Sequence, residues 1–228
     1  MTDKEHLAAL NDWPYLASLP RELAGFSLSA GPRENNGNID IFSYENAALR
    51  KKLRCFYNRA TRDYMLRYIF GLNEYNNSKY ITPDLNLFTA LLREGLTFAA
   101  AELAAFSRAK DYSSLKNKGI PAWAYQGALP DACCGFELYI RPDAPAPFIN
   151  GSFIVADYSD FAGGHQFVLY YNELRDEFFA EKKRAGSVET TAFFDARTLK
   201  ELDKKLREYL PGYLEDFRRQ IIGLTATA

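Results

Sequence analysis

Residues 157–165 bring together several side chains that could do chemistry. The segment reads Asp-Tyr-Ser-Asp-Phe-Ala-Gly-Gly-His, so Asp157 and Asp160 precede two glycines and His165 follows them. His165 is one of only two histidines in the chain. The other, His6, lies close to the N-terminus, where we expect a frayed segment. Carboxylates and an imidazole are the groups from which general acid–base and metal sites are built. We therefore expect any such site to form here.

Cys133 and Cys134 could supply a nucleophile to this segment. A catalytic thiol needs a neighbouring base to form the thiolate, and a third polar group orients that base. His165 would be the base, and Asp157 or Asp160 would orient its ring. The alternative is that both cysteines are small, partly buried residues at the start of a strand, because free cysteines often fill cores without reacting.

The run Asp-Ala-Cys-Cys-Gly-Phe at residues 131–136, followed further along by a histidine that leads into an apolar strand, resembles the NlpC/P60 branch of papain-like cysteine peptidases. The resemblance implies a cysteine nucleophile and a histidine base. In that family the cysteine opens a helix, whereas residues 136–140 alternate as a strand does and Pro142 soon follows.

A divalent metal site is a second interpretation of the same segment. Asp157, Asp160 and His165 would be its ligands, with Glu173 or Asp176 adding an oxygen, and such mixed ligands suit first-row metals. The alternative is that these aspartates build turns by accepting hydrogen bonds from their own backbone.

The basic segment at residues 44–70 suggests a third chemistry. It carries seven basic and two acidic side chains, interleaved with tyrosines and with Phe56, which is a composition that can bind phosphates and stack on bases. Residues 131–181 are acidic in compensation and offer these charges an intramolecular partner. We do not expect nucleic-acid binding, because the 28 basic and 29 acidic residues of the chain nearly balance.

Composition narrows the class of protein further. A chain of 228 residues with 47% hydrophobic content can form a sizeable core. The first residues lack the pattern of a secretory signal, no apolar run is long enough to cross a membrane, and three cysteines make a poor disulfide framework. We therefore expect a cytoplasmic protein with reduced thiols. No nucleotide cofactor is indicated, because P-loop and dinucleotide fingerprints are missing from the sequence.

Hydrophobic spacing predicts two long helices in the first half of the chain. Apolar residues recur at steps of three and four from Leu49 to Tyr64, which predicts a helix over residues 44–70. A second helix is predicted over residues 82–110, with Thr82 as its N-cap and Pro83 as its first residue. We therefore expect residues 1–115 to be mainly helical.

Short aromatic and β-branched segments predict strands in the second half. These segments lie at residues 123–126, 135–140, 152–157, 166–171, 177–183 and 188–194. The short links between them suit antiparallel neighbours. Thr198 and Glu201 then form a capping-box pattern that begins a helix, which we expect Pro211 and Gly212 to end before a second short helix.

These segments together predict an α+β fold: a mainly helical N-terminal half packed on a C-terminal antiparallel sheet of five to six strands, closed by one or two C-terminal helices. We divide the chain into a mainly helical region, 1–118, and a sheet region with C-terminal helices, 119–228, which share one core. No internal repeat is evident in the sequence.

The absence of a specific catalytic motif favours a noncatalytic binding or interaction module for a protein or a small ligand. The 15 tyrosines and 17 phenylalanines fit an adhesive surface and allow a homo-oligomer. The alternative is a hydrolase or metal-dependent enzyme around Asp157, Asp160 and His165, with Cys133 or Cys134 as nucleophile.

Overall fold

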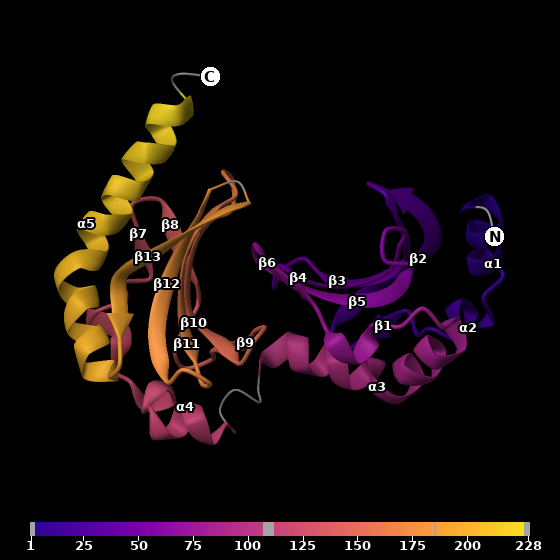
Figure 1. Ribbon diagram of the computed structural model, residues 1–228, viewed down its shortest axis with the longest axis horizontal. Helices are drawn as coiled ribbons and strands as arrows, with labels where there is room; N and C mark the ends of the chain where they lie inside the picture. Colours follow the sequence, from indigo (N-terminus) through magenta and orange to yellow (C-terminus); the bar gives the residue numbers. More distant parts are fainter. Residues whose placement is uncertain (1–2, 107–111, 185, 226–228) are drawn as a thin grey trace. The chain divides into compact units, whose positions relative to one another are not determined.

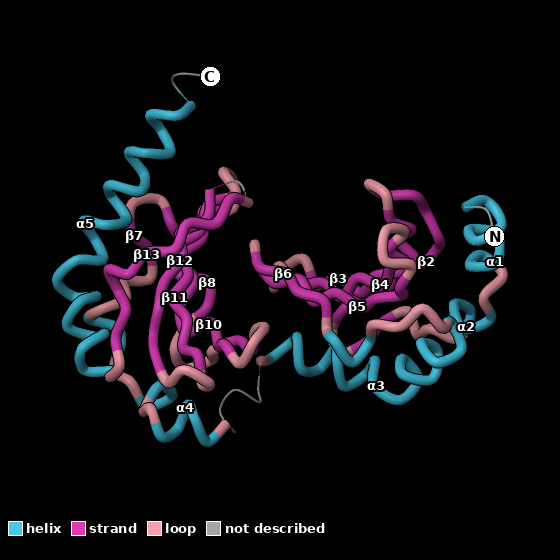
Figure 2. The backbone as a smooth tube through the Cα atoms, in the orientation of Figure 1, coloured by secondary structure: helices cyan, strands magenta, loops and turns pink. Residues whose placement is uncertain are grey.

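The computed structural model describes residues 3–106, 112–184 and 186–225, and the chain divides into two compact units, Met1–Ala105 and Phe106–Ala228 (Figure 1). We call them unit 1 and unit 2. Each contains one antiparallel sheet and one long helix that runs along a face of that sheet (Figures 1 and 2). The described helices include none with the length and apolar character needed to cross a membrane.

Unit 1 has a six-stranded sheet whose strands follow one another in chain order. Its elements are α1 (Asp3–Asn11), α2 (Pro14–Ala17), β1 (Glu22–Leu23), β2 (Phe26–Asn35), β3 (Asn38–Asn46), β4 (Lys51–Asn58), β5 (Asp63–Phe70), β6 (Asn73–Asn76), the 3-10 helix η1 (Ser78–Tyr80) and α3 (Leu85–Ala105).

Unit 2 has a seven-stranded sheet of order β13-β12-β11-β10-β8-β7, with β9 paired to β10. Its elements are α4 (Ser113–Asn117), the 3-10 helices η3 (Ile120–Ala122) and η4 (Tyr125–Gly127), β7 (Ala132–Cys133), β8 (Phe136–Ile140), β9 (Ala146–Pro147), β10 (Ser152–Asp160), β11 (His165–Asn172), β12 (Glu177–Arg184), β13 (Ser187–Ala196) and α5 (Leu199–Thr225).

The two units repeat one design. Strands β3, β4 and β5 have the same lengths as β10, β11 and β12, with the same separation along the chain between each pair. The cross-strand partners correspond too: Tyr64 pairs with Thr82, and at the same separation Phe178 pairs with Ala196. Helices α3 and α5 begin at equivalent residues, Leu85 and Leu199. We interpret this shared order and spacing of elements as an internal duplication, which was not evident from the sequence.

The start of each unit carries the clearest sequence trace of this duplication. Six residues recur in unit 2 at identical spacing: Trp13, Tyr15, Leu19, Pro20, Gly25 and Phe26 correspond to Trp123, Tyr125, Leu129, Pro130, Gly135 and Phe136. One of these residues, the proline, accepts an equivalent hydrogen bond in each unit. The hydroxyl of Tyr44 donates a 2.7 Å hydrogen bond to the carbonyl of Pro20, and that of Tyr158 donates a 2.6 Å bond to the carbonyl of Pro130.

Each unit also opens its sheet with the same tight hairpin. Two residues link β1 to β2 and β7 to β8, and both have positive φ: 49° and 80° at Ala24 and Gly25, 52° and 81° at Cys134 and Gly135. This is the type I′ turn, whose twist matches that of the strands. Ala24 and Cys134 adopt a left-handed conformation that disfavours residues with a Cβ, so both turns store strain.

The predicted α+β fold with a mainly helical region 1–118 was wrong, because the structure is mostly β and residues 44–70 form most of a β-meander. Leu49 and Ala60, which suggested a helical face, lie in the turns between strands. Phe56 and Leu53 differ by an odd number of residues within β4 and therefore point to opposite faces of the sheet. The abundance of tyrosine and phenylalanine over these residues was the contrary signal.

Three further predictions need correction. Residues 123–126 are not a strand but include η4. Helix α3 is capped by Asp84, whose Oδ1 accepts from the N–H groups of Asn86 and Leu87, and not by Thr82. Helix α5 continues through Pro211. Its leucine stripe explains why: a proline inside a helix costs about 3 kcal/mol, whereas burying one leucine contributes about 1.5–3 kcal/mol. The buried leucines are Leu202, Leu206, Leu210 and Leu214.

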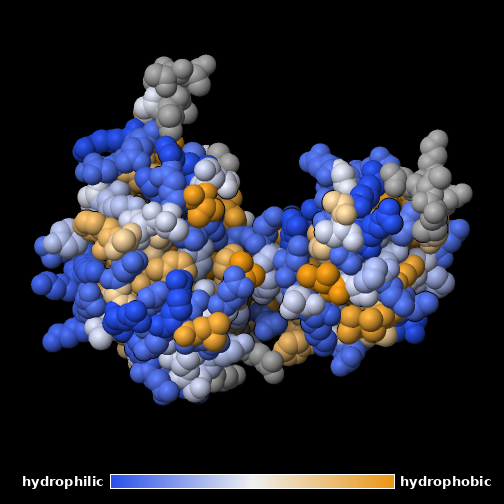
Figure 3. Space-filling model, in the orientation of Figure 1, coloured by the Kyte–Doolittle hydropathy of each residue, from blue (hydrophilic) through white to orange (hydrophobic). Residues whose placement is uncertain are grey.

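The remaining strands of unit 2 and their antiparallel pairing are confirmed, although the sheet has seven strands and not the predicted five to six. The start of α5 is confirmed as well, since the Glu201 N–H donates to Thr198 Oγ1. Where α5 packs on the sheet, Phe136 stacks on Phe217 at 5.4 Å between ring centroids. On the face seen in Figure 3, hydrophilic residues predominate and the hydrophobic residues form separate patches.

The paired tyrosine tethers predict matched stability effects. Tyr44→Phe and Tyr158→Phe each remove one hydrogen bond to a carbonyl while keeping the ring, so each should lower the free energy of unfolding by about 1 kcal/mol. Denaturant titration of the whole chain measures this. Tyr112→Phe is the control, because no hydrogen bond of its hydroxyl is present in the described structure. A loss in one unit with no change in the other would contradict equivalent roles.

Candidate functional site

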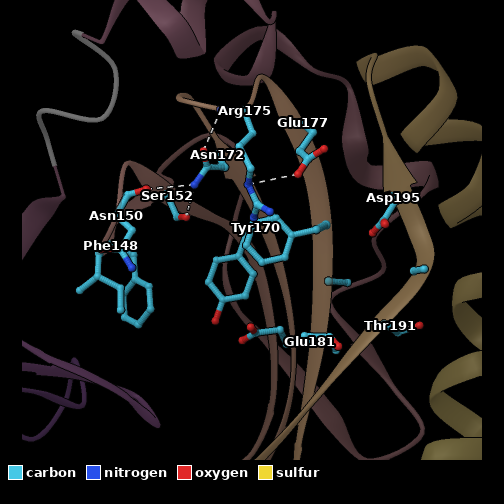
Figure 4. A pocket seen from close by; sticks show the side chains of 15 residues that line it. Phe148, Asn150, Ser152, Tyr170, Asn172, Arg175, Glu177, Glu181, Thr191 and Asp195 are labelled. Carbon is cyan, nitrogen blue, oxygen red and sulfur yellow. Dashed lines mark hydrogen bonds and ion pairs between the residues drawn. The ribbon is translucent and has the colours of Figure 1, made fainter.

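A pocket of about 430 Å³ lies on the face of the unit 2 sheet opposite α5 (Figure 4). We call it the β12 pocket. It is lined by Phe148, Ile149, Asn150, Ser152, Tyr170, Asn172, Arg175, Glu177, Phe179, Ala180, Glu181, Thr190, Thr191, Ala192 and Asp195. Side chains alternate along β11 and β12, so Tyr171 and Phe178 join the core under α5 while Tyr170 and Phe179 face the pocket.

An irregularity in strand pairing opens this pocket. Ala180 pairs with Thr191, but Phe178 pairs with Ala196, so a single β12 residue, Phe179, faces residues 192–195 of β13. β13 must bow away from its neighbour over this stretch. The space between the two strands is part of the pocket, which explains why residues of both strands line it.

Aromatic rings form the floor of the β12 pocket. Tyr170 and Phe179 stack with 4.8 Å between ring centroids and 14° between ring planes, and Phe148 lies 5.9 Å from Tyr170. The guanidinium of Arg175 lies 5.2 Å above the Phe179 ring and pairs with Glu177 at 3.2 Å. Figure 4 shows Arg175 and Glu177 reaching toward each other at one end of the pocket. The pocket already holds one cation of its own against an aromatic ring.

The carboxylates of the pocket differ in their partners. Glu177 pairs with Arg175 and, at 3.4 Å, with Arg197. Glu181 and Asp195 form no ion pair with any residue in the described part of the chain. Burial, followed by the neighbouring Glu181 carboxylate, raises the pKa of Tyr170 far above its usual value. Tyr170 is therefore a neutral phenol beside a carboxylate that forms no ion pair in the described structure, although the ammonium of Lys183 is close enough to interact with it.

A buried polar cluster lies next to the pocket on the same face. Asp157 is completely buried and accepts hydrogen bonds from Ser159 Oγ at 2.8 Å and Gln166 Nε2 at 3.1 Å. The ammonium of Lys183 lies 5.9 Å from the Tyr170 ring. Burial lowers the pKa of Lys183, although Glu181 and Asp157 oppose that shift. Asp157 therefore interacts with Lys183 on the open face of the sheet. It takes no part in the loop between β10 and β11.

Asp160 and His165 lie on the other face, toward α5. They pair across β10 and β11, and Asp160 accepts hydrogen bonds from Arg218 Nη1 at 2.7 Å and from the Gly163 N–H at 3.1 Å. Burial acts to raise the pKa of Asp160, but the bonds from Arg218 and Gly163 together hold it below its usual value. Nδ1 of His165 is buried and has no hydrogen-bond partner in the described part of the chain.

The proposed metal ligands do not converge. Asp157 lies on the face opposite to Asp160 and His165. Glu173 accepts from Ser114, and Asp176 pairs with Lys118 at 2.5 Å, at the turn between β11 and β12. Within the described ranges no three histidine, cysteine or acidic side chains are grouped so that they could hold a metal ion.

The cysteines contact each other and not His165. Their Sγ atoms lie 3.5 Å apart, and Cys134 Sγ donates to the carbonyl of Pro211 at 3.9 Å. Burial, followed by the hydrogen bond with Cys134, raises the pKa of the Cys133 thiol to about 11. A nucleophilic cysteine needs the opposite shift. No hydrogen bond joins either sulfur to His165 among the described contacts.

Comparison with unit 1 gives Cys134, Asp160 and His165 a structural role. In unit 1 the positions of Cys134, Asp160 and His165 are held by Ala24, Asn46 and Lys51. Asn46 Nδ2 donates to the carbonyl of Gly25 at 2.8 Å, and Lys51 Nζ donates to the carbonyl of Ala104 in α3 at 2.8 Å. In unit 2 Arg218, the equivalent of Ala104, donates to the carbonyl of Cys134 at 2.8 Å. In both units these residues tie the first hairpin, the sheet and the helix together.

His6 is ordered, contrary to our expectation of a frayed terminus. It is buried, its ring lies 4.1 Å from that of Tyr57, and its Nε2 lies 3.3 Å from the hydroxyl of Tyr64. The second histidine therefore packs α1 against the sheet of unit 1.

The basic residues of 44–70 find their acidic partners inside unit 1. Arg54 pairs with Asp40 at 2.5 Å. Three more pairs join neighbouring strands or turns: Lys52 with Glu45, Arg59 with Glu34, and Arg67 with Glu74. Few basic side chains of this segment are therefore left to bind phosphate groups.

Sequence reasoning missed the residues of the β12 pocket. Tyr170 lies in one predicted strand, and Phe179 and Glu181 lie at alternate positions of the next, so the sequence could have placed them on one face. The sequence also places Arg175 and Glu177 close to the turn between those strands. The pairing irregularity that opens the pocket has no comparable signal in the sequence.

Comparisons with protein-family models, with curated proteins and with solved structures found no match to this chain.

The raised pKa of Cys133 predicts slow, pH-dependent alkylation. Because the thiolate is the reactive form, its rate of reaction with iodoacetamide should rise about tenfold per pH unit from pH 8 to 10. Tandem mass spectrometry of the Cys133 peptide measures the rate, and Cys134→Ser is the control for assignment to one sulfur. His165→Asn should leave the rate unchanged. A rate that is already at its plateau at pH 8, or that falls in His165→Asn, would support a thiol–imidazole pair instead.

Proposed function

We propose that this protein is a binding module whose unit 2 holds a cationic group in the β12 pocket. The chemical class is an ammonium or guanidinium, as on lysine or arginine side chains or on organic amines. The volume of about 430 Å³ lies within the usual range for ligand pockets. The chemistry of the lining, aromatic rings beside carboxylates, is the chemistry that recognises organic cations.

The main support is the comparison with the same place in unit 1. There Phe56, the equivalent of Tyr170, is completely buried under two guanidinium groups, Arg54 at 4.8 Å and Arg67 at 5.0 Å from its ring. Unit 1 therefore supplies its own cations to the aromatic residue on its open sheet face.

Unit 2 has neither of those arginines, and its cation over the equivalent ring is Lys183, whose ammonium lies 5.9 Å from the Tyr170 centroid. The equivalents of Arg54 and Arg67 are Val168 and Glu181. A carboxylate now stands where unit 1 places a guanidinium, and it has no ion-pair partner in the described structure. The two units therefore differ in charge at this position, and a ligand cation beside Glu181 would complete an arrangement like that of unit 1.

Arg175 supports the same conclusion from within the pocket. Its side chain is 60% exposed, yet its guanidinium stays over Phe179 and beside Glu177. The pocket therefore accepts a guanidinium over Phe179, while Glu181 and Asp195 form no ion pair in the described structure. Cation–π contacts contribute about 0.5–2 kcal/mol and exposed ion pairs about 0.2–1 kcal/mol. A single side chain should consequently bind in the millimolar range, and a longer ligand more tightly.

The test is titration of the whole chain with N-acetyl-arginine amide, followed by the NMR shifts of the pocket residues. N-acetyl-glutamine amide serves as the neutral comparison. The arginine compound should bind with a Kd of about 1 mM and weaken as salt rises. Glu181→Gln and Asp195→Asn should each weaken it about three- to tenfold, since each removes up to roughly 1.4 kcal/mol.

Asp143→Asn is the matched control, because Asp143 is an exposed acid outside the pocket. Equal binding of the neutral compound, or equal weakening by Asp143→Asn and Glu181→Gln, would refute a cation site in the β12 pocket.

A further inference from the structure

The edges of the two sheets are unequal. Three of the four terminal strands are short: β1 and β7 have two residues each and β6 has four. The fourth, β13, has ten residues, Ser-Val-Glu-Thr-Thr-Ala-Phe-Phe-Asp-Ala, with no proline, lysine or arginine. Proteins usually protect an edge with those residues or by shortening the strand, because an exposed edge pairs with any available strand. β13 has neither protection, although its irregular pairing opposite Phe179 bends part of the edge.

The duplication shows how the same edge is closed in unit 1. After β6 the chain turns through η1, where Tyr80 is buried and Lys79 lies beside it. The equivalents in unit 2 are Phe194, which is buried, and Phe193, which is 48% exposed. Both units anchor one aromatic residue under the helix. In unit 1 a lysine and a 3-10 turn prevent further strand pairing at this edge. In unit 2 the chain stays extended and exposes a phenylalanine.

The backbone of β13 is correspondingly open on its outer side. Apart from bonds to β12, two of its backbone groups have hydrogen-bond partners among the described residues: the Phe193 N–H donates to Thr191 Oγ1, and the Asp195 carbonyl accepts from Lys205. An antiparallel edge strand turns alternate N–H and C=O groups outward. Those groups are available to a further strand.

Binding surfaces flank this edge on both faces of the sheet. On the open face lies the β12 pocket, to which β13 contributes Thr190, Thr191, Ala192 and Asp195. On the helix face Phe193 lies 5.0 Å from Tyr209 and 6.1 Å from Tyr213 of α5, measured between ring centroids. An added strand points successive side chains to opposite faces. It would thus meet an acidic aromatic pocket and an aromatic patch in alternation.

We propose that β13 accepts an extended segment of a partner protein as an added strand, with a lysine or arginine side chain in the β12 pocket and an apolar side chain against Phe193 and Tyr209. Charge complementarity favours this occupant, because Glu181 and Asp195 form no ion pair in the described part of the chain. Main-chain hydrogen bonds would give affinity and the two side-chain sites would give specificity. The inference rests on the proposed function for the nature of the pocket residue.

The test begins with selection of displayed random heptapeptides on the full-length chain. Enriched sequences should place lysine or arginine next to an apolar residue in alternation. The best peptide, carrying a fluorophore, is then titrated by anisotropy. Phe193→Lys, which introduces the residue type found at the equivalent position of unit 1, should weaken it at least tenfold. Val188→Lys tests the other end of the same edge, where Val188 is 52% exposed, and should also weaken it.

Leu87→Lys is the matched control, because Leu87 is 51% exposed on α3 of unit 1 and the change adds the same charge. It should leave peptide binding unchanged. Failure to enrich any peptide, or full binding by both Phe193→Lys and Val188→Lys, would overturn strand addition. So would a homodimer in sedimentation that Phe193→Lys dissociates, because a second copy would then occupy the edge.

The two proposals fail separately. Binding of N-acetyl-arginine amide should survive Phe193→Lys, since Phe193 does not line the β12 pocket. If that compound binds but no peptide does, the pocket stands and the strand addition is wrong. If peptides bind at the edge without basic residues and the compound does not bind, the cation site is wrong.

Discussion

The burial of one sheet face under a single amphipathic helix is the interaction on which both units depend. In unit 2 the leucine stripe of α5 and the aromatic residues of β10, β11 and β13 form one continuous core. That packing is strong enough to keep α5 helical through Pro211. It also uses only one face of the sheet. The other face has to be stabilised by its own side chains, and it is there that the two units differ.

The differences follow a consistent pattern of charge exchange. Unit 1 covers Phe56 with Arg54 and Arg67, and neutralises those arginines with Asp40 and Glu74. Unit 2 places Tyr170 at the same position with Val168 and Glu181 around it. In the first arrangement both arginines have acidic partners, whereas in the second the Glu181 carboxylate forms no ion pair in the described structure. A duplicated fold can keep one copy for stability and let the other lose a stabilising interaction, since most single exchanges on a surface change stability little.

How far the sequence predicts this structure depends on the kind of signal that each element leaves. The strands of unit 2 were visible because turn residues separate their aromatic and β-branched runs, and the start of α5 was visible in Thr198 and Glu201. The sheet of unit 1 was not, because apolar residues of its strands and turns, such as Leu53 and Ala60, happen to follow a helical spacing.

The duplication was hidden because Trp13, Pro20 and Gly25 recur at one separation and the later strands at another, across an insertion that includes β9. Asp160 and His165 were expected to meet and they pair across the strands, but Asp157 could not join them, since it lies three positions before Asp160 on one strand and points to the other face.

The β12 pocket and the open edge have one physical origin, which is the bowing of β13 away from β12. Regular pairing from Ala180 to Phe178 would have closed the gap that forms the pocket. The same irregularity lets Phe194 reach the core while Phe193 stays at the surface, so a buried anchor and an exposed contact come from adjacent residues. Unit 1 resolves the equivalent stretch with a 3-10 turn that brings Tyr80 inward and leaves Lys79 outside. A short segment between two conserved pairing points, Tyr64 with Thr82 and Phe178 with Ala196, therefore decides whether the edge is closed or open. Because those points are retained in both units, this segment can diverge without disturbing the core that holds the rest of the sheet.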